Sequence, residues 1–427
     1  MKINNKRLKL LNDTKDKKIL EKEDFEQIDF INLHAHSTYS LQDAVGQVED
    51  HFVKTIDAGH CGCCITDHGS YASFIDLHNL TKNKIGSNKV TEKFKKHEIQ
   101  EHPVVMGAEL YIIDDRHIQP LIDLSDRDDR PGITEILTKM SKNPQWKDIY
   151  FEKKSIEDIE VQLEKSKKIG SLLLRKINSL SNTELKLKIE EFNKASTKCT
   201  SYKYNHITLM AKNSVGHSNI CHLTSIGSLP ENFYVRPRIR FTDLIENKEG
   251  IIVTSGCFVG MIPQAIHKNT GLEEEYFELF SKEFGDDFYI EIHLTDVSYN
   301  WDKNLQQHVK TIAVNPMIKV NDRLVELASK YGLEKNVYIT QDSHMPNKED
   351  KAIQDIIIMN DPGNKSNWHF KNVYYIQEIE EMYKAMRDGF PHYTNEQFIN
   401  WCFNTMTVLN KSRDLDIDMS LSFVKPD

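Results

Sequence analysis

Two short stretches decide the fold: Leu33-His34-Ala35-His36-Ser37 early in the chain and Gln341-Asp342-Ser343-His344 late in it. Each directly follows an apolar run that predicts a strand. Side chains alternate along a strand, so a strand that ends in His-x-His presents both imidazoles on one face. Asp-x-His repeats this arrangement with a carboxylate, a ligand mix that suits zinc, manganese or iron. The two stretches therefore predict two halves of one metal site, and a fold that brings the first and last strands together.

Composition excludes several classes of protein. The chain has 427 residues and a net charge of −9, which argues against a strongly basic nucleic-acid-binding surface but leaves room for a local basic groove. Its apolar stretches are short and its N-terminus is polar, so we expect a cytoplasmic protein without a membrane span or secretory signal. The seven cysteines are odd in number, and Cys61, Cys63 and Cys64 share one strand-like run, which favours reduced, buried thiols.

Strand-like and helix-like segments alternate along the chain. The strand candidates lie at 28–34, 61–66, 103–112, 206–211, 250–254, 286–293 and 336–341. The amphipathic helix candidates lie at 47–59, 70–80, 215–227, 272–284 and 318–332. Strands separated by helices predict parallel pairing through right-handed crossovers, in an open sheet or in a barrel. In both folds, functional side chains collect at the C-terminal ends of the strands.

Residue types that bind metals gather at these strand ends. They are His34 and His36 after the first strand, His68 after the second, Glu109 late in the third, Cys257 after the fifth, and Asp342 with His344 after the seventh. Surface residues would be scattered over both ends of the strands, so this concentration predicts a multinuclear metal site. A lone His-x-His is more often incidental, and Cys257 alone would be interpreted as a small buried residue at a turn. The prediction of a metal site therefore rests on the combination of these residues at the strand ends.

Other polar residues have different interpretations. Asp67 directly precedes His68, so its side chain points to the other face of the strand and is expected to support the site rather than bind metal. Arg236 and Arg238 are candidates for binding a phosphate, although arginines beside a proline are often only part of a solvated strand or loop. His293 ends an alternating strand pattern and is interpreted as an ordinary barrel residue.

Five motifs, in order, carry a family resemblance. They are Leu33–Ser37, Thr66-Asp67-His68-Gly69, His206-Ile207-Thr208-Leu209-Met210-Ala211-Lys212-Asn213, Ser255-Gly256-Cys257 and Gln341–His344. Together they resemble the PHP (polymerase and histidinol phosphatase) domain, and more narrowly the PHP domains of bacterial replicative DNA polymerases. The resemblance implies an α/β fold, a distorted seven-stranded (β/α) barrel similar to a TIM barrel, with a helical insertion.

The resemblance also implies nine ligands around two to three divalent ions of zinc, manganese or iron. They are His34, His36, Asp43, His68, Glu109, His206, Cys257, Asp342 and His344. His206 is the exception in position, because it begins its strand whereas most of the others lie at strand ends.

The chain divides into parts on the same basis. Residues 1–27 form a polar lead, 28–114 and 204–427 form the barrel, and 115–203 form a charge-rich insertion with leucine and isoleucine at helical spacing. The insertion is either a solvated spacer, or a lid or docking arm. The sequence stops near the end expected for a PHP domain, so we expect a free-standing protein, a fragment or one chain of a split polymerase.

By resemblance, the protein is a metal-dependent phosphoesterase, and the polymerase branch favours a DNA 3′–5′ exonuclease that uses a metal-activated water. Glu109 would bridge metals, Asp342 would orient the attack, and His34 completes the catalytic set. Two alternatives stay open: a phosphatase of small phosphomonoesters of the histidinol-phosphatase type, and a non-catalytic scaffold. DNA is the expected substrate, and a DNA polymerase or another replication subunit is a candidate partner.

Overall fold

The computed structural model describes residues 2–41, 43–81, 88–116, 204–230, 232–233, 236–302, 304–305, 307–360, 373–413 and 415–417. The predicted insertion at 115–203 lies outside these residues, apart from its first two positions. Within the described ranges, no helix is long and apolar enough to cross a membrane.

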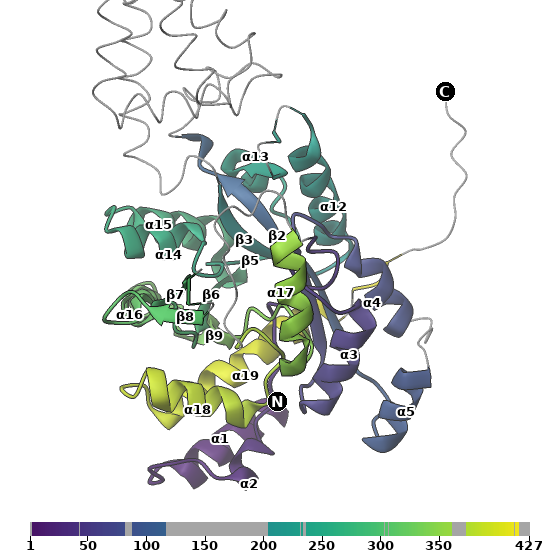
Figure 1. The fold of residues 1–427 in the computed structure, drawn as a ribbon, viewed down its shortest axis with the longest axis vertical. Coiled ribbons are helices and arrows are strands. Elements are labelled where there is room, and N and C mark those ends of the chain that lie inside the picture. The colour runs from purple at the N-terminus through teal and green to yellow at the C-terminus, as the bar shows by residue number, and fades with distance from the viewer. Residues whose placement is uncertain are drawn as a thin grey trace, which may run out of the picture.

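A curled sheet forms the centre of the molecule, with helices packed around it (Figure 1). Its strands are β1 (Cys63–His68), β2 (Val104–Ile113), β3 (Asn205–Ala211), β4 (Arg238–Arg240), β5 (Ile251–Thr254), β6 (Phe288–His293) and β9 (Val337–Thr340). They run in the order β1-β2-β3-β5-β6-β9, and β4 pairs with the last residues of β2. Nearly every residue of these strands is buried, as expected for strands covered on both faces. The α/β class is confirmed, and six of the seven predicted strand ranges are correct to within two residues.

The first predicted strand, 28–34, is an extended segment rather than a regular strand. It ends in a parallel bridge between Ala35 and Ser343, where Ser343 N donates to His34 O at 3.1 Å. On its other side, Thr66 N donates to Ala35 O at 2.7 Å. The segment therefore lies between β1 and the residues that follow β9, and it brings the two ends of the curled sheet together.

The direction of β3 differs from the prediction. The sequence predicts parallel pairing throughout, but β3 pairs antiparallel with both β2 and β5. The start of β3 therefore lies at the same edge of the sheet as the ends of the other strands. In this register Tyr111 of β2 faces His206, and Glu109 faces Thr208.

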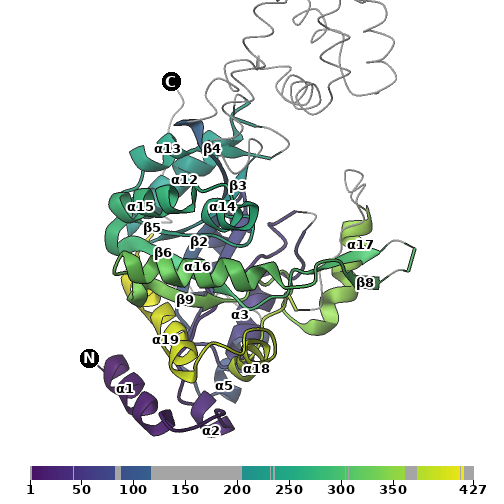
Figure 2. The same ribbon diagram turned by 90° about the vertical axis from the view of Figure 1, so that its left-hand side faces the viewer.

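Helices occupy the predicted positions and several others. The predicted ones are α3 (Val48–Asp57), α4 (Ser73–Thr81), α12 (Ser214–Ser228), α15 (Glu273–Phe284) and α16 (Pro316–Lys330). The others are α1 (Lys2–Thr14), α2 (Lys22–Phe25), α5 (Asn88–Lys96), α13 (Phe241–Glu246), α14 (Met261–Lys268), α17 (Lys351–Asn360), α18 (Ile379–Gly389) and α19 (Asn395–Ser412). α14 packs against α15 and α16 along one flank of the sheet (Figure 2), where Ile262, Phe277 and Val320 are fully buried.

The N-terminal range and the segment after β6 contain structure that the sequence analysis does not predict. The range 1–27, predicted only as a polar lead, contains α1, whose Arg7 Nε donates to Asn400 Oδ1 of α19 at 2.7 Å. Leu10 of α1 is fully buried, so the lead is part of the packed structure. The strands β7 (Tyr299–Asp302) and β8 (Gln307–Lys310) form a separate antiparallel hairpin after β6.

Helix α12 approaches the turn before β5 very closely. Asn213 caps the helix, because its Oδ1 accepts a hydrogen bond from Gly216 N at 3.0 Å. A Cβ atom on Gly216 would lie 1.8 Å from Gly250 O, so only glycine allows this contact. The close approach holds the helix that follows β3 against the start of β5.

Candidate metal centre

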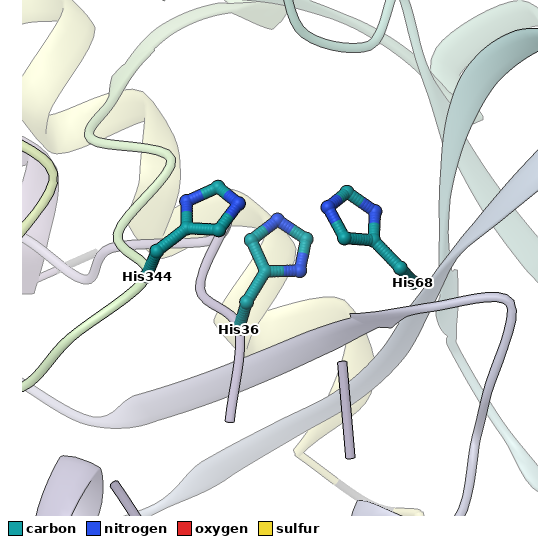
Figure 3. A group of neighbouring side chains, drawn as sticks. All are labelled: His36, His68 and His344. Atoms are coloured by element: carbon teal, nitrogen blue, oxygen red, sulfur yellow. The ribbon is translucent and has the colours of Figure 1, made fainter. Parts of the chain in front are cut away.

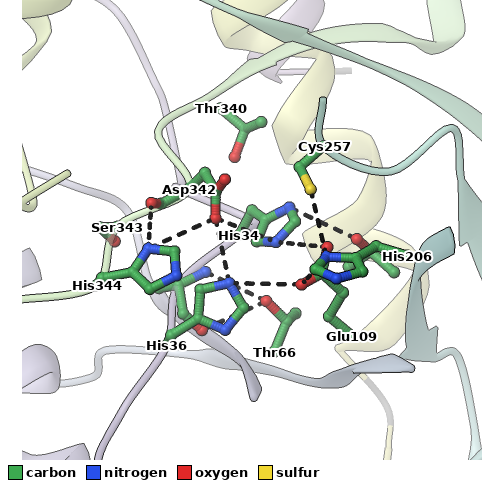
Figure 4. A network of polar contacts seen from close by, with 12 residues as sticks. His34, His36, Thr66, Glu109, His206, Cys257, Thr340, Asp342, Ser343 and His344 are labelled. Atoms are coloured by element: carbon green, nitrogen blue, oxygen red, sulfur yellow. Dashed lines mark hydrogen bonds and ion pairs between the residues drawn. The ribbon is translucent and has the colours of Figure 1, made fainter. Parts of the chain in front are cut away.

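The nine predicted ligand residues lie in one cluster at the edge of the sheet where most of the strands end. Figure 4 labels His34, His36, Glu109, His206, Cys257, Asp342 and His344 among them. Residues from opposite ends of the chain meet there. His36 Nε2 lies 3.1 Å from Asp342 Oδ1, although 306 positions separate them in the sequence. The bridge between Ala35 and Ser343 produces this contact, because it aligns His-x-His with Asp-x-His side by side.

Glu109 lies at the centre of the cluster and is 1% exposed. Its Oε2 lies 2.6 Å from His68 Nδ1 and 3.1 Å from His206 Nδ1, and its Oε1 lies 3.3 Å from His34 Nε2. Burial raises the pKa of Glu109, but the surrounding imidazoles outweigh burial and hold the pKa well below its ordinary value. An ionised carboxylate among several imidazoles is the arrangement that a bridging metal ligand requires.

Three imidazoles lie together beside this carboxylate: His36, His68 and His344 (Figure 3). The ring of His36 stacks on that of His68 with centroids 4.0 Å apart, and one nitrogen from each of the three lies within 4.8 Å of the others. Burial, His68 and His344 all lower the pKa of His36, which favours the neutral imidazole that binds metals. Three further groups have the same spacing: His34 with His36 and Asp342, His68 with Glu109 and His206, and His34 with Glu291 and His293. Because the groups share members, they form one connected cluster of possible metal ligands.

Partners at the edge of the cluster hold the Nδ1 atoms of three histidines. Nδ1 of His34 lies 2.8 Å from Glu291 Oε2, and Nδ1 of His36 lies 3.2 Å from Ser40 Oγ. Nδ1 of His344 donates to a backbone carbonyl two residues earlier, at 2.9 Å. Such bonds fix the tautomer and orientation of a metal-binding histidine. In each case Nε2 is left for the cluster.

The two aspartates of the cluster are held in the charged form. Asp342 has a φ of 50°, in the left-handed region that aspartate tolerates better than most residues. Burial raises its pKa, but His34 and the imidazoles beside it hold the pKa far below the ordinary range. Burial also raises the pKa of Asp43. The contact with His68, whose Nε2 lies 2.9 Å from Asp43 Oδ2, outweighs burial and lowers this pKa.

His206 and Cys257 lie together on another side of the cluster. Cys257 Sγ lies 3.5 Å from His206 Nδ1. The antiparallel direction of β3 explains why His206 reaches the cluster from the start of its strand. Burial, with Glu109 and Asp342 nearby, raises the pKa of the Cys257 thiol well above its ordinary value. A bound cation would reverse this preference and favour the thiolate.

Asp67 supports the loop that follows His36. Its Oδ1 accepts hydrogen bonds from Ser37 N at 2.7 Å and from Ser40 Oγ at 2.8 Å. Ser40 Oγ in turn accepts a hydrogen bond from His68 N at 3.0 Å. These bonds tie the loop to the end of β1.

The two predicted phosphate-binding arginines differ in their surroundings. The guanidinium of Arg236 lies over the ring of Tyr111, 5.8 Å from its centroid, and that ring lies 5.2 Å from the ring of His206. Arg238 is 6% exposed, and its Nε donates to Asn232 O at 3.2 Å. These contacts favour a structural role for Arg238 and leave Arg236 at the border of the cluster.

The predicted site does not include Glu291, although this carboxylate contacts His34. Glu291 is fully buried and also accepts hydrogen bonds from His293 Nε2 and Thr254 Oγ1. Burial raises its pKa, but His34 and His293 outweigh burial and lower the pKa to about 2. The available signal was a lone acidic residue within the apolar strand Phe288–His293. His293, interpreted as an ordinary barrel residue, belongs to this same network.

The buried atoms at the centre fit divalent cations. Among the described residues, His68 Nδ1 and both carboxylate oxygens of Glu109 are buried without a hydrogen-bond partner. His68 Nδ1 and Glu109 Oε2 are close, but their geometry is not that of a hydrogen bond. Polar atoms in this state are rare, because each loses about 1–3 kcal/mol of hydration. Imidazole, carboxylate and thiolate form a donor set that suits zinc, manganese and iron.

Comparison with known proteins identifies the family. Residues 32–295 match the PHP domain. The chain belongs to the PHP domain family. This confirms the resemblance that the five motifs indicate.

The chain is similar in sequence to DNA polymerase III α subunits. The chain is 29% identical to the α subunit of Borreliella burgdorferi over 84% of its own length and 22% of that protein. It is 35% identical to the α subunit of Thermus aquaticus over 42% of its length, and 29% identical to that of Treponema pallidum over 45%, covering 14% and 15% of those proteins. The PHP chain therefore spans about a fifth or less of the length of these relatives. A crystal structure from Bifidobacterium adolescentis aligns over 84% of this chain and 96% of that one at 13% identity, but its TM-score of 0.28 is too low for further inference.

Proposed function

We propose that the protein is a metal-dependent phosphoesterase that hydrolyses phosphodiester bonds of DNA, as a 3′–5′ exonuclease. The observation that carries the proposal is the position of Glu109, a carboxylate that is 1% exposed and lies within 3.3 Å of ring nitrogens of His34, His68 and His206. A buried charge of this kind is unfavourable unless cations compensate it. Such an arrangement suits a metal centre better than a purely structural core.

The nine clustered residues would hold two to three divalent ions, with Glu109 as the shared ligand. The ions would supply positive charge that acidifies a water molecule and neutralises the phosphoryl oxygens. The chain supplies rigidity, because the strand ends set the spacing of the imidazoles and the Nδ1 partners set their orientation. The mixed nitrogen, oxygen and sulfur donors are compatible with zinc, manganese or iron.

The substrate would approach over the more exposed ligands. The side chains of Asp43, Asp342 and His206 are 25%, 14% and 12% exposed, whereas those of His34 and His36 are fully buried. Asp342 is ionised and lies on this open side, so its carboxylate is placed to accept a hydrogen bond from the attacking water. The buried imidazoles would hold the geometry behind it.

Arg236 would bind a phosphate of the DNA backbone. A guanidinium matches phosphate oxygens through paired hydrogen bonds, and its position over Tyr111 limits its orientations. The open side of the cluster is otherwise acidic through Asp43 and Asp342. A cation at its border would reduce the repulsion between these carboxylates and the backbone.

The similarity to DNA polymerase III α subunits supports DNA as the substrate rather than a small phosphomonoester. We expect a role in DNA replication in the cytoplasm, with a DNA polymerase or another replication subunit as a partner. A histidinol-phosphatase type of activity is the second candidate. The net charge of −9 favours it, because an acidic protein repels a small phosphate ester less strongly than a polyanion.

Metal analysis of the purified protein, combined with digestion of 5′-labelled DNA, tests the proposal. We expect bound metal, stepwise loss of nucleotides from the 3′ end when manganese or zinc is added, and a steep salt dependence from phosphate contacts. His34→Ala and Asp342→Ala should abolish digestion without changing the far-ultraviolet circular dichroism. His392→Ala is the matched control, since this histidine is exposed and pairs with Asp322 on the surface; it should keep full activity.

Two outcomes would overturn the nuclease proposal. Hydrolysis of histidinol phosphate with DNA left intact would select the phosphatase. Tight metal binding without turnover of either substrate would support a non-catalytic scaffold.

A further inference from the structure

We propose that Glu291 is a positioning residue that orients His34 so that Nε2 of this histidine faces the metal cluster. The inference rests on the proposed metal centre and adds a residue outside the nine ligands. It assigns a role to the buried carboxylate in the middle of β6.

Glu291 is the nearer of two polar groups at His34 Nδ1. Its Oε2 lies 2.8 Å from that nitrogen, whereas Thr208 Oγ1 lies 3.5 Å away, at the limit of a hydrogen bond. The side chains of His34, Glu291 and Thr208 are fully buried, so water does not compete for a hydrogen bond with this nitrogen. Nδ1–H therefore donates to Glu291, and Nε2 faces Glu109 at 3.3 Å and Asp342 at 3.5 Å.

The carboxylate of Glu291 is itself held in place. Thr254 Oγ1, at the end of β5, donates to its Oε1, and His293 Nε2 lies 3.2 Å from its Oε2. The backbone N–H of Glu291 donates to Ser255 Oγ at 3.0 Å. Because these partners come from two paired strands, Glu291 provides a rigid reference for the imidazole of His34.

A role as a direct ligand is less compatible with these contacts. His34, Glu291 and His293 have a spacing that could hold an ion of their own. An ion at that position would displace two hydrogen bonds that the carboxylate already makes to the two histidines. The positioning role requires no such rearrangement.

In this proposal Glu291 is a carboxylate outside the ligand set that controls the tautomer of His34, a metal-binding histidine. Loss of such a partner typically weakens metal affinity by about 10–100-fold. Glu291→Gln keeps the volume of the side chain but introduces an amide that can donate to Nδ1. That would place the ring proton on Nε2, where it blocks metal binding, as amide replacements do in catalytic triads.

Glu291→Gln and Thr208→Val, made in the full chain, form a matched pair, because each changes one of the two buried polar neighbours of the same nitrogen. Zinc affinity would be measured by competition with a chromophoric chelator. The Nδ1–H signal of His34 would be followed by NMR of zinc-loaded, ¹⁵N-histidine-labelled protein and assigned by its absence in His34→Gln. We expect Glu291→Gln to bind zinc about 10–100-fold more weakly with unchanged stoichiometry at saturation, and to lose the hydrogen-bonded Nδ1–H signal. Thr208→Val should keep that signal, with zinc affinity within about twofold of the wild type.

Equal zinc affinity in Glu291→Gln and the wild type would overturn the inference. So would the loss of one zinc equivalent with the remaining affinity unchanged, since that result would make Glu291 a ligand. If Glu291→Gln does not fold, the wild-type spectrum decides, and a His34 ring that binds zinc through Nδ1 would refute the proposal. These readouts do not depend on DNA cleavage, so failure of the nuclease activity and failure of the positioning role are distinguishable. A wild-type protein that binds no zinc would overturn both.

Discussion

Replacing Glu109 by glutamine removes the charge at the centre of the cluster and keeps the volume of the side chain. The two carboxylate oxygens lie within 3.3 Å of ring nitrogens of His34, His68 and His206. An uncharged amide would therefore weaken the binding of every ion that Glu109 is proposed to share. We expect zinc or manganese affinity to fall by about 100-fold or more, at or beyond the upper end of the range of about 10–100-fold seen when an outer partner is lost.

The loss should be visible in the part of the stability that depends on metal. At a metal concentration of about 100 times the wild-type Kd, binding adds about 2.7 kcal/mol to the free energy of unfolding. A variant that binds about 100-fold more weakly gains only about 0.4 kcal/mol at the same concentration. The increase in the free energy of unfolding on adding metal should therefore be about 2.3 kcal/mol smaller in Glu109→Gln than in the wild type.

Urea unfolding with chelator and with added metal measures each increment against the protein's own metal-free baseline. Glu283→Gln is the matched control, because Glu283 is a carboxylate of α15 that pairs with Lys248 at 2.7 Å, and it should keep the full increment. A full metal-dependent increment in Glu109→Gln would refute the assignment of Glu109 as the shared ligand.

Acid should weaken the fold through His60, because burial lowers the pKa of this imidazole to about 4. In the unfolded chain the group titrates near pH 6.5, so stability should fall as the pH drops from about 6.5 to 4, by about 3 kcal/mol for this group. Urea unfolding of His60→Gln should show a smaller loss over this range, and an equal loss in both proteins would contradict the argument. Gly216→Ala should destabilise the protein by about 3 kcal/mol or more, because its Cβ would lie 1.8 Å from a backbone oxygen. Gly227→Ala on the same helix meets its nearest atoms at 3.4 Å and should be nearly neutral in the same assay, so similar effects at the two sites would count against the packing argument. Arg236→Ala should raise KM for DNA about tenfold and flatten its salt dependence, whereas Arg413→Ala should change neither; an unchanged KM would remove Arg236 from the substrate contacts.

The sequence by itself determined the elements of the fold and the chemistry of the site. Periodicity along a strand or helix is a local property, and six strand ranges could therefore be placed to within two residues. The same alternation placed His34 beside His36 on one edge, and the shared edge of the strand ends brought the other candidate ligands to them. Seven of the nine lie in the cluster for this reason, whereas Asp43 lies in the loop that follows His36, and His206 lies at the start of an antiparallel strand.

Only the tertiary structure decided the direction of β3 and the partners of individual side chains. A strand buried on both faces has the same apolar pattern whether it runs parallel or antiparallel to its neighbours, so the sequence could not show how His206 reaches the cluster. The contact of Glu291 with His34 joins residues 257 positions apart, and the burial of Arg238 likewise depends on packing between elements. Periodicity reports which side chains are buried, whereas the contacts between buried groups depend on how the chain closes the sheet.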